Sequence, residues 1–295
     1  MSIADVSKRW EQLLRREFGH IDGAFLDTFR APGPANRFVA WDPGELSQSY
    51  FKFLLFNTAQ KQSAAFFKAY KALRHRDVGR PLTVRCGGCD IDADYLAAVE
   101  EWEFLHDAGA LAGVRTVVEI GAGFGRTCHA LLTLHPDIEH YIIVDLKPML
   151  ALSTAYLQRT MPGANITFIP NEELERVLAV TPDLVINIDS FQEMPPPVIG
   201  RYMTEVVGRA KLFYCKNPVG KYLPAMMGLA EVDSEHVVDA FSLGYCQNVI
   251  DIFDDDDLRR ARASSLKAYC PPGWSVSSSK VMDLFPHYLH ALYGR

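Results

Sequence analysis

Short β-branched runs alternate with helical stretches from about residue 114 onward, and this alternation constrains the fold more than any other feature of the sequence. The runs are apolar almost throughout, so a sheet built from them must be covered on both faces. Strand followed by helix, several times over, predicts an α/β fold with a doubly wound, mostly parallel sheet. The expected strands are TVVEI (116–120), YIIVD (141–145), ITFIP (166–170), DLVINI (183–188) and KLFYC (211–215).

The first part of the chain has a different pattern. Residues 44–73 and 92–109 carry apolar side chains at steps of three and four, which predicts amphipathic helices. We therefore expect a helical region over residues 1–110, serving as a lid or as the surface of a homodimer, and an α/β domain over residues 111–295. Beyond residue 217 the pattern weakens, and 244–253 and 278–294 are expected to supply late strands and a helix.

Composition narrows the classes of partner. The 295 residues carry a formal net charge of −6, which argues against a protein that neutralises the phosphates of nucleic acid. No apolar run approaches the roughly 18 to 20 residues that span a bilayer, and the polar start resembles no signal peptide. We expect a cytoplasmic protein that acts on a small molecule.

Two motifs suggest metal sites at first sight. Cys86 and Cys89 have the CxxC spacing, but a structural zinc site needs a second pair at similar spacing, and none follows. The acidic run in DIFDDDDLRRA (252–262) directly precedes a helical stretch, where carboxylates cap the first turn. We expect reduced thiols in the first case and a helix cap in the second.

Three glycines lie between the end of the first expected parallel strand and the start of the helix that follows it. Gly121, Gly123 and Gly125 in EIGAGFG leave backbone amides bare, so that a ligand can approach them and the positive end of the helix. A dinucleotide fingerprint would place its third glycine at position 126, which is Arg126 here. Glu119 would favour a cationic ligand over a diphosphate. The loop therefore predicts a cofactor without a pyrophosphate.

Polar side chains follow each of the next three strands. Asp145 ends the second strand, where a carboxylate can accept both hydroxyls of a ribose. Asn171 or Glu172 follows the third strand and could read an adenine amino group. Asp189 and Ser190 follow the fourth. Parallel strands end at one edge of a sheet, so these groups are expected around one crevice.

The loop EIGAGFG resembles the cofactor loop of class I S-adenosylmethionine-dependent methyltransferases. More specifically, VVEIGAGFGRTCHALL, HYIIVDLKPMLALSTAYLQ, DLVINIDSFQEMP and CKNPVGKY resemble the bacterial sugar O-methyltransferase family found in surface-polysaccharide and antibiotic gene clusters, over about residues 100–225. The resemblance implies a seven-stranded Rossmann-like methyltransferase sheet that binds S-adenosyl-L-methionine. The residues expected to bind it are Glu119, Gly121, Ala122, Gly123, Phe124, Gly125, Asp145, Leu146, Asn171, Asp189 and Ser190.

Transfer of a methyl group to a sugar hydroxyl calls for a base or a metal, because the hydroxyl is a very weak acid. Asp189 and Glu193 lie four residues apart and would share a face of a helical turn. One could hold the cofactor while the other orients or deprotonates the acceptor. The less favoured alternative is that the pair binds a divalent cation together with an acid from SEHVVD (234–239). His236 in that stretch is a further candidate base.

The acceptor itself is expected to meet amide, carboxylate, ammonium and phenol groups near the fourth and fifth strand ends. The residues are Gln192, Glu193, Asn217, Lys221 and Tyr222. The expected function is S-adenosylmethionine-dependent O-methylation of a sugar or sugar-bearing metabolite. A non-sugar hydroxyl or amine of a natural product is the nearest alternative acceptor. A NAD-dependent oxidoreductase and a non-catalytic S-adenosylmethionine-binding module are the alternatives from other classes.

Overall fold

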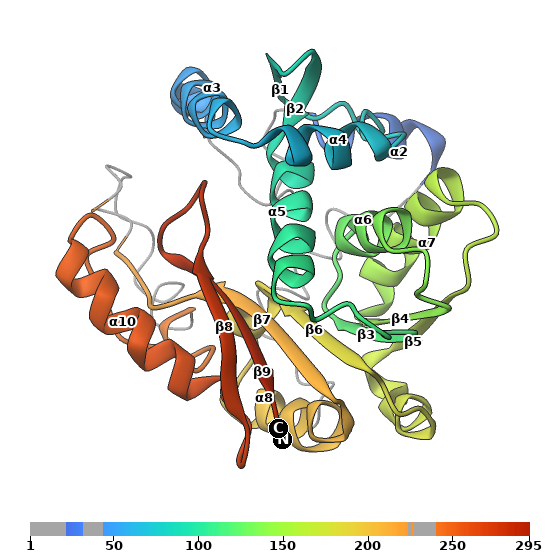
Figure 1. Ribbon diagram of the computed structural model, residues 1–295, viewed down its shortest axis with the longest axis vertical. Coiled ribbons are helices and arrows are strands. Elements are labelled where there is room, and N and C mark those ends of the chain that lie inside the picture. The colour runs from blue at the N-terminus through green and yellow to red at the C-terminus, as the bar shows by residue number, and fades with distance from the viewer. Residues whose placement is uncertain (1–21, 32–43, 224–225, 227–239) are drawn as a thin grey trace.

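The computed structural model describes residues 22–31, 44–223, 226 and 240–295, and within them a twisted seven-stranded sheet forms the centre (Figure 1). The strand order is β5-β4-β3-β6-β7-β9-β8. All neighbouring pairs from β5 to β7 are parallel, whereas β9 runs antiparallel to β7 and β8. This order, with its single reversed strand, is that of the Rossmann-like methyltransferase fold. The strands are β3 (Thr116–Ile120), β4 (His140–Asp145), β5 (Ile166–Pro170), β6 (Leu184–Ile188), β7 (Leu212–Pro218), β8 (Ser275–Val281) and β9 (Tyr288–Gly294).

The chain enters the sheet at its centre, and this placement creates the crevice. From β3 the chain moves outward to β4 and β5, then returns to β6 on the other side of β3. Ligands of open α/β sheets bind where the strand order switches in this way. The carboxyl ends of β3 and β6 therefore define the place where a site is expected.

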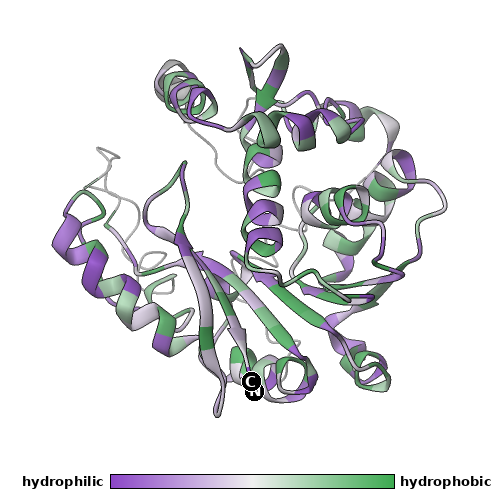
Figure 2. Cartoon of the chain, in the orientation of Figure 1, coloured by the Kyte–Doolittle hydropathy of each residue, from purple (hydrophilic) through white to green (hydrophobic). Residues whose placement is uncertain are grey.

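Helices cover both faces of the sheet, as the apolar strands require. Every residue of β6 is buried, and its side chains alternate between two cores: Leu184 and Ile186 face one, Val185 the other. The helices and 3₁₀ segments are α5 (Ala93–Asp107), α6 (Arg126–Leu134) and α7 (Lys147–Thr160) on the first face, and η1 (Asn171–Ala179), α8 (Pro196–Glu205), η3 (Val207–Arg209) and α10 (Asp255–Ala268) on the second. Figure 2 shows the middle strands largely green and α10 largely purple, as expected of a surface helix.

The five strands predicted from the sequence are confirmed, with differences at their ends. β3 and β5 match the predicted ranges residue for residue. β7 instead continues to Pro218, because β9 pairs with it along its whole length, from Leu212 opposite Gly294 to Pro218 opposite Tyr288. The added pairing places Asn217 inside a strand, not in the loop where it was predicted.

The late strands that were predicted are found in 278–294, which supplies β9 and part of β8, but not in 244–253. In this stretch the structure has an isolated parallel bridge between Val249 and Lys221. The side of β7 next to this stretch is already paired, because β9 lies along β7 from Leu212 to Pro218. By contrast, the predicted helix cap is confirmed, because Asp254 accepts hydrogen bonds of 2.8 Å from the backbone amides of Asp256 and Asp257 at the start of α10.

The N-terminal region contains a hairpin that was not expected. Helices α2 (Gly23–Thr28), α3 (Gly44–Gln60) and α4 (Ala64–Ala72) precede β1 (Thr83–Cys86) and β2 (Cys89–Asp92). Gly87 and Gly88, with φ of +58° and +78°, make the two-residue turn that hairpins favour. The Gly-Gly pair between Cys86 and Cys89 was the sequence signal. All six cysteines lie in the described part of the chain and are free thiols.

Helix α5 joins this region to the sheet. It is buried along most of its length, and it packs against α6 and β9 at its sides (Figure 1). The boundary between residues 110 and 111 therefore falls directly after a helix that completes one face of the α/β core. In the described part of the chain, no helix is both long and apolar enough to cross a membrane.

Candidate cofactor and acceptor site

The glycine loop turns sharply at the carboxyl end of β3. Gly121, Gly123 and Gly125 have φ of +74°, +60° and +94°, in the left-handed region that favours glycine. A Cβ on Gly121 would overlap the hydroxyl of Ser190, whereas a Cβ on Gly123 would meet nothing within 4 Å. Gly121 is therefore required for packing against the turn after β6, and Gly123 faces open space at the sheet edge.

Asp145 lies beside that open space, at the end of β4. Its Oδ2 accepts a hydrogen bond of 3.1 Å from the amide of Gly123, and its Oδ1 accepts one of 2.8 Å from the amide of Leu146. Burial raises the pKa of this carboxyl to about 7, against the lowering effect of the backbone amides. The predicted ribose-binding carboxylate and the glycine loop are thus in direct contact.

Two of the predicted cofactor residues direct their side chains into the interior. The carboxyl of Glu119 is buried in β3, where it accepts a hydrogen bond of 2.7 Å from the hydroxyl of Tyr141, and burial raises its pKa to about 7. Phe124 is also buried; its ring lies 4.9 Å from that of Tyr156 and 5.2 Å from the guanidinium of Arg30. At the loop itself Phe124 presents its backbone.

A network of side-chain amides that was not predicted from the sequence links β3, β6 and β7 at the switch point. Asn187 in β6 donates to the carbonyl of Ile120 at 3.0 Å and to the hydroxyl of Ser190 at 2.6 Å. Ser190 donates in turn to the same carbonyl at 3.1 Å. Asn217 of β7, which is 2% exposed, donates to Oδ1 of Asn187 at 2.8 Å. This hydrogen bond holds the Asn187 side chain in place from the neighbouring strand. An asparagine inside an otherwise apolar strand was the available signal.

Asp189 holds a strained backbone at the carboxyl end of β6. Its φ of +67° is unusual for a residue other than glycine, and such strain gathers at functional sites. Its Oδ1 accepts hydrogen bonds from the hydroxyl of Tyr288 at 3.0 Å and from the amide of Gln192. Burial raises the pKa of this carboxyl, although Tyr288 and the cation of Lys216 oppose the shift.

The turn after Asp189 brings a different residue beside it from the one predicted. Residues Ser190–Glu193 form a 3₁₀ turn, η2, in which side chains three apart lie on the same side. Gln192 therefore contacts Asp189, and Glu193, the residue predicted to lie beside it, follows one position later in the turn. Tyr288, which lies on β9, was also missed, because nothing in the local sequence links it to residue 189.

Lys221 and Tyr222, both predicted to contact the acceptor, lie close to this turn. The Lys221 ammonium donates to the carbonyl of Gln192 at 3.1 Å. Burial lowers its pKa, while the nearby carboxylate of Glu193 has the opposite effect. The ring of Tyr222 meets the ring of His287 edge to face, with centroids 5.5 Å apart.

The remaining candidates divide between the described and the undescribed parts of the chain. Asn171 directly follows β5, as predicted, and is buried at the start of η1. His236 and the acidic stretch 234–239 lie outside the described residues. Among the residues that the structure does describe, no three His, Cys, Asp or Glu side chains gather as a metal site would require.

A buried ionic cluster behind the site was not predicted. Glu101 of α5 pairs with Arg126, at the first position of α6, through contacts of 2.9 and 3.2 Å. It also pairs with Lys216 of β7 and accepts a hydrogen bond of 3.0 Å from Thr127. Burial alone would raise the pKa of Glu101, but the two cations lower it to about 2. The three elements that meet beside the glycine loop are thus joined through one carboxylate.

Comparison with known proteins gives similarity to solved structures alone. Neither family models nor curated protein sequences match the chain. A provisionally assigned caffeoyl-CoA O-methyltransferase from Staphylococcus aureus is 14% identical, with 85% of this chain and 100% of that chain covered and a TM-score of 0.46. The mitomycin 7-O-methyltransferase MmcR is 13% identical, with 89% and 76% covered and a TM-score of 0.43. The pyocyanin biosynthetic protein PhzM is 12% identical, with 89% and 76% covered and a TM-score of 0.42. At TM-scores below 0.5, the fold assignment rests on strand order and direction.

Proposed function

We propose that the protein is an S-adenosylmethionine-dependent methyltransferase. The observation that carries the proposal is the pairing of Asp145 with the open glycine loop at the switch point of this sheet. A carboxylate at the end of the second strand of the parallel unit can accept the hydroxyls of a ribose. The space in front of Gly123, which a side chain would fill, leaves room for the rest of the nucleoside.

The residues present fit such a cofactor. The backbone of residues 121–125 would lie against its amino acid part, Asp145 and Leu146 against its ribose, and Asn171 against its adenine. Asp189 and Ser190 would face its reacting end from β6. When bound, the cofactor supplies a methyl group on a positively charged sulfonium. Asp189, if ionised, would favour that charge.

A nicotinamide dinucleotide fits less well, for an electrostatic reason. The carboxylate of Asp145 already accepts the amide of Gly123, in the loop that would have to cradle a diphosphate. The side chain of Arg126 turns inward to Glu101 and is unavailable to neutralise a phosphate. Calorimetric titration of the protein with S-adenosylhomocysteine and with NADH tests which of the two cofactor classes it binds. Binding of NADH in preference to S-adenosylhomocysteine would overturn the proposal.

For the acceptor we propose a hydroxyl of a sugar or of a sugar-bearing metabolite. Among the residues that the structure describes, we assign to Asp189, oriented by Tyr288 and Gln192, the role of accepting a hydrogen bond from that hydroxyl or taking its proton. Lys221 and Tyr222 add an ammonium and a phenol on the same side, which suit a polyhydroxylated ligand. The sequence resemblance supports a sugar; a non-sugar hydroxyl or an amine remains the alternative acceptor.

The deciding experiment is a methylation assay. The protein is incubated with S-adenosylmethionine and a panel of nucleotide sugars, glycosylated metabolites and aglycones, with and without a chelator. Mass spectrometry is expected to show the gain of one methyl group on a sugar-bearing compound, unchanged by chelation. Methylation of aglycones alone would refute the sugar acceptor, and loss of activity with chelator would refute the metal-free mechanism.

A further inference from the structure

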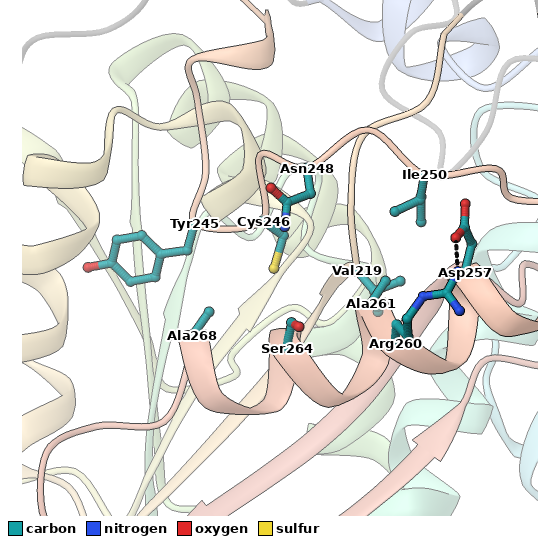
Figure 3. Close-up of a pocket in the computed structure, with 10 residues that line it drawn as sticks. All are labelled: Val219, Tyr245, Cys246, Asn248, Ile250, Asp257, Arg260, Ala261, Ser264 and Ala268. Carbon is teal, nitrogen blue, oxygen red and sulfur yellow. Dashed lines mark hydrogen bonds and ion pairs between the residues drawn. The ribbon is translucent and has the colours of Figure 1, made fainter.

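A cavity lies beside the segment whose backbone pairs with that of Lys221. It measures about 290 Å³, lies between α10 and the segment 244–250 just beyond the end of β7, and is partly open to solvent (Figure 3). Val219, Ile250 and Ala261 supply its buried apolar wall. Figure 3 shows Tyr245 at one end of the cavity and the Asp257–Arg260 pair at the other.

The lining carries no net charge. Asp257 and Arg260 form an ion pair with each other, and Asp257 also accepts a hydrogen bond of 3.0 Å from the amide of Asp251. Burial raises the pKa of the Cys246 thiol, so this group stays protonated near neutral pH. Asn248 and Ser264 add a neutral amide and a neutral hydroxyl. A charged ligand would find no unpaired counter-ion among these groups, which favours a neutral ligand.

The size of the cavity limits what can enter. An apolar cavity of about 150 Å³ holds one benzene molecule, and ordinary ligand pockets begin near about 300 Å³. The present cavity therefore has room for one substituted ring or two fused rings.

The segment that lines the cavity is hydrogen-bonded to residues on the proposed acceptor side. The backbone of Lys221 bonds to that of Asn248 and Ile250, each at 2.8 Å, and its ammonium bonds to Gln192. Gly244, at the start of the segment, donates its amide to the carbonyl of Met194 at 2.9 Å and lies against Gln192. The segment that closes the cavity is thus fastened to the turn that carries Asp189.

We propose that this cavity is a second small-molecule site, for a neutral ring-sized group that carries a hydroxyl or a carbonyl. The ring lies against Val219, Ile250 and Ala261, and the polar substituent faces Asn248 and Ser264. The site is distinct from the glycine loop and does not depend on the proposed methyl transfer.

The test uses 2-naphthol as a neutral probe and naphthalene-2-sulfonate as its anionic counterpart, with calorimetry on the full chain. We expect 2-naphthol to bind and the sulfonate to bind at least tenfold more weakly. Ala268→Trp, on the cavity side of α10, is expected to weaken 2-naphthol at least tenfold. Ala263→Trp introduces the same side chain at an exposed position of the same helix that does not line the cavity, and is expected to have no effect.

Two further variants make the test independent of the conformation that the introduced Trp side chain adopts. Ala261→Leu fills the cavity from its buried wall, and Asn248→Leu removes the amide at nearly constant size. Both are expected to weaken the binding of 2-naphthol. Asn248→Leu is expected to bind it only as tightly as the wild-type protein binds naphthalene, which lacks the hydroxyl. Equal binding by the filled variants, or by the sulfonate, would overturn the proposal. S-adenosylhomocysteine is titrated into every variant. Failure of the wild-type protein to bind it would count against the proposed methyltransferase, not against the cavity.

Discussion

At the scale of single residues, two neighbouring glycines of the loop have different tasks. Gly121→Ala places a methyl group against Ser190 and also strains the backbone, so we expect a loss of stability larger than the roughly 1–2 kcal/mol of left-handed strain alone. Gly123→Ala adds strain without a clash, so its main effect should be weaker cofactor binding. Thermal unfolding and S-adenosylhomocysteine titration separate the two. Equal losses of stability would contradict this division.

Asp145 should make stability depend on pH in a defined direction. Its folded pKa of about 7 lies above its usual value of 3.8, so the folded state holds this proton more tightly than the unfolded state. The associated stability is complete below about pH 4 and is lost as pH rises through about 7.

Asp145→Asn removes this titration. We expect the variant to gain stability relative to the wild type as pH rises from 5 to 8, while its affinity for S-adenosylhomocysteine falls at least tenfold. Urea unfolding at both pH values measures the first effect, and calorimetry the second. A stability difference that is the same at pH 5 and pH 8 would rule out the assigned titration.

Tyr288 is expected to act through Asp189. Tyr288→Phe removes a hydrogen bond to the half-buried side chain of Asp189, whose backbone is strained. If losing this hydrogen bond raises the activation free energy by about 1.4 kcal/mol, kcat falls about tenfold, and cofactor affinity changes little. Tyr293→Phe, on the same strand and packed against the opposite core, is the control and should leave kcat unchanged. A fall in cofactor affinity that matches the fall in kcat would show a general structural role.

At the scale of elements, one buried carboxylate joins α5, α6 and β7. Glu101→Gln leaves Arg126 and Lys216 buried without their anion, and we expect a loss of about 3–5 kcal/mol. Lys216→Met leaves the Arg126–Glu101 pair intact and should cost less. Urea unfolding at pH 7 compares them, and a larger loss in Lys216→Met would contradict the account.

The same cluster should also respond to acid. The folded pKa of Glu101, about 2, lies below its usual 4.5, so its contribution is present above about pH 4.5 and fades as pH falls toward 2. The stability difference between Glu101→Gln and the wild type should therefore shrink at pH 3.

Elements differed in how well the sequence predicted them. β3 to β7 were recognised because strands buried on both faces must be apolar throughout, whatever their surroundings. The stretch 244–253, in which Gln247, Asn248 and Asp251 interrupt the apolar residues, forms an isolated bridge with Lys221, while β9 pairs with β7 along its whole length. Strand character is a local property, whereas access to a sheet edge is not.

At the scale of the whole molecule, the helical region and the sheet are expected to fold together. A chain reduced to residues 111–295 would lose α5, expose one apolar face and leave Arg126 and Lys216 without Glu101. We expect it to lack the cooperative thermal transition of the full chain, measured by circular dichroism. A truncated chain that unfolds cooperatively and binds S-adenosylhomocysteine would support the boundary at residues 110 and 111 as a true domain boundary.

By itself, the sequence determined the α/β class, the parallel strands, the glycine loop and the acidic group at the end of β4. These follow from apolar pattern and from short-range spacing, which the order of residues specifies directly. Only the tertiary structure decided what surrounds Asp189: Tyr288 arrives from β9, Gln192 through the 3₁₀ turn, and Lys216 from β7. It also decided that Glu101 neutralises the arginine after the glycine loop. Such contacts depend on the strand order, which brings together residues far apart in the chain.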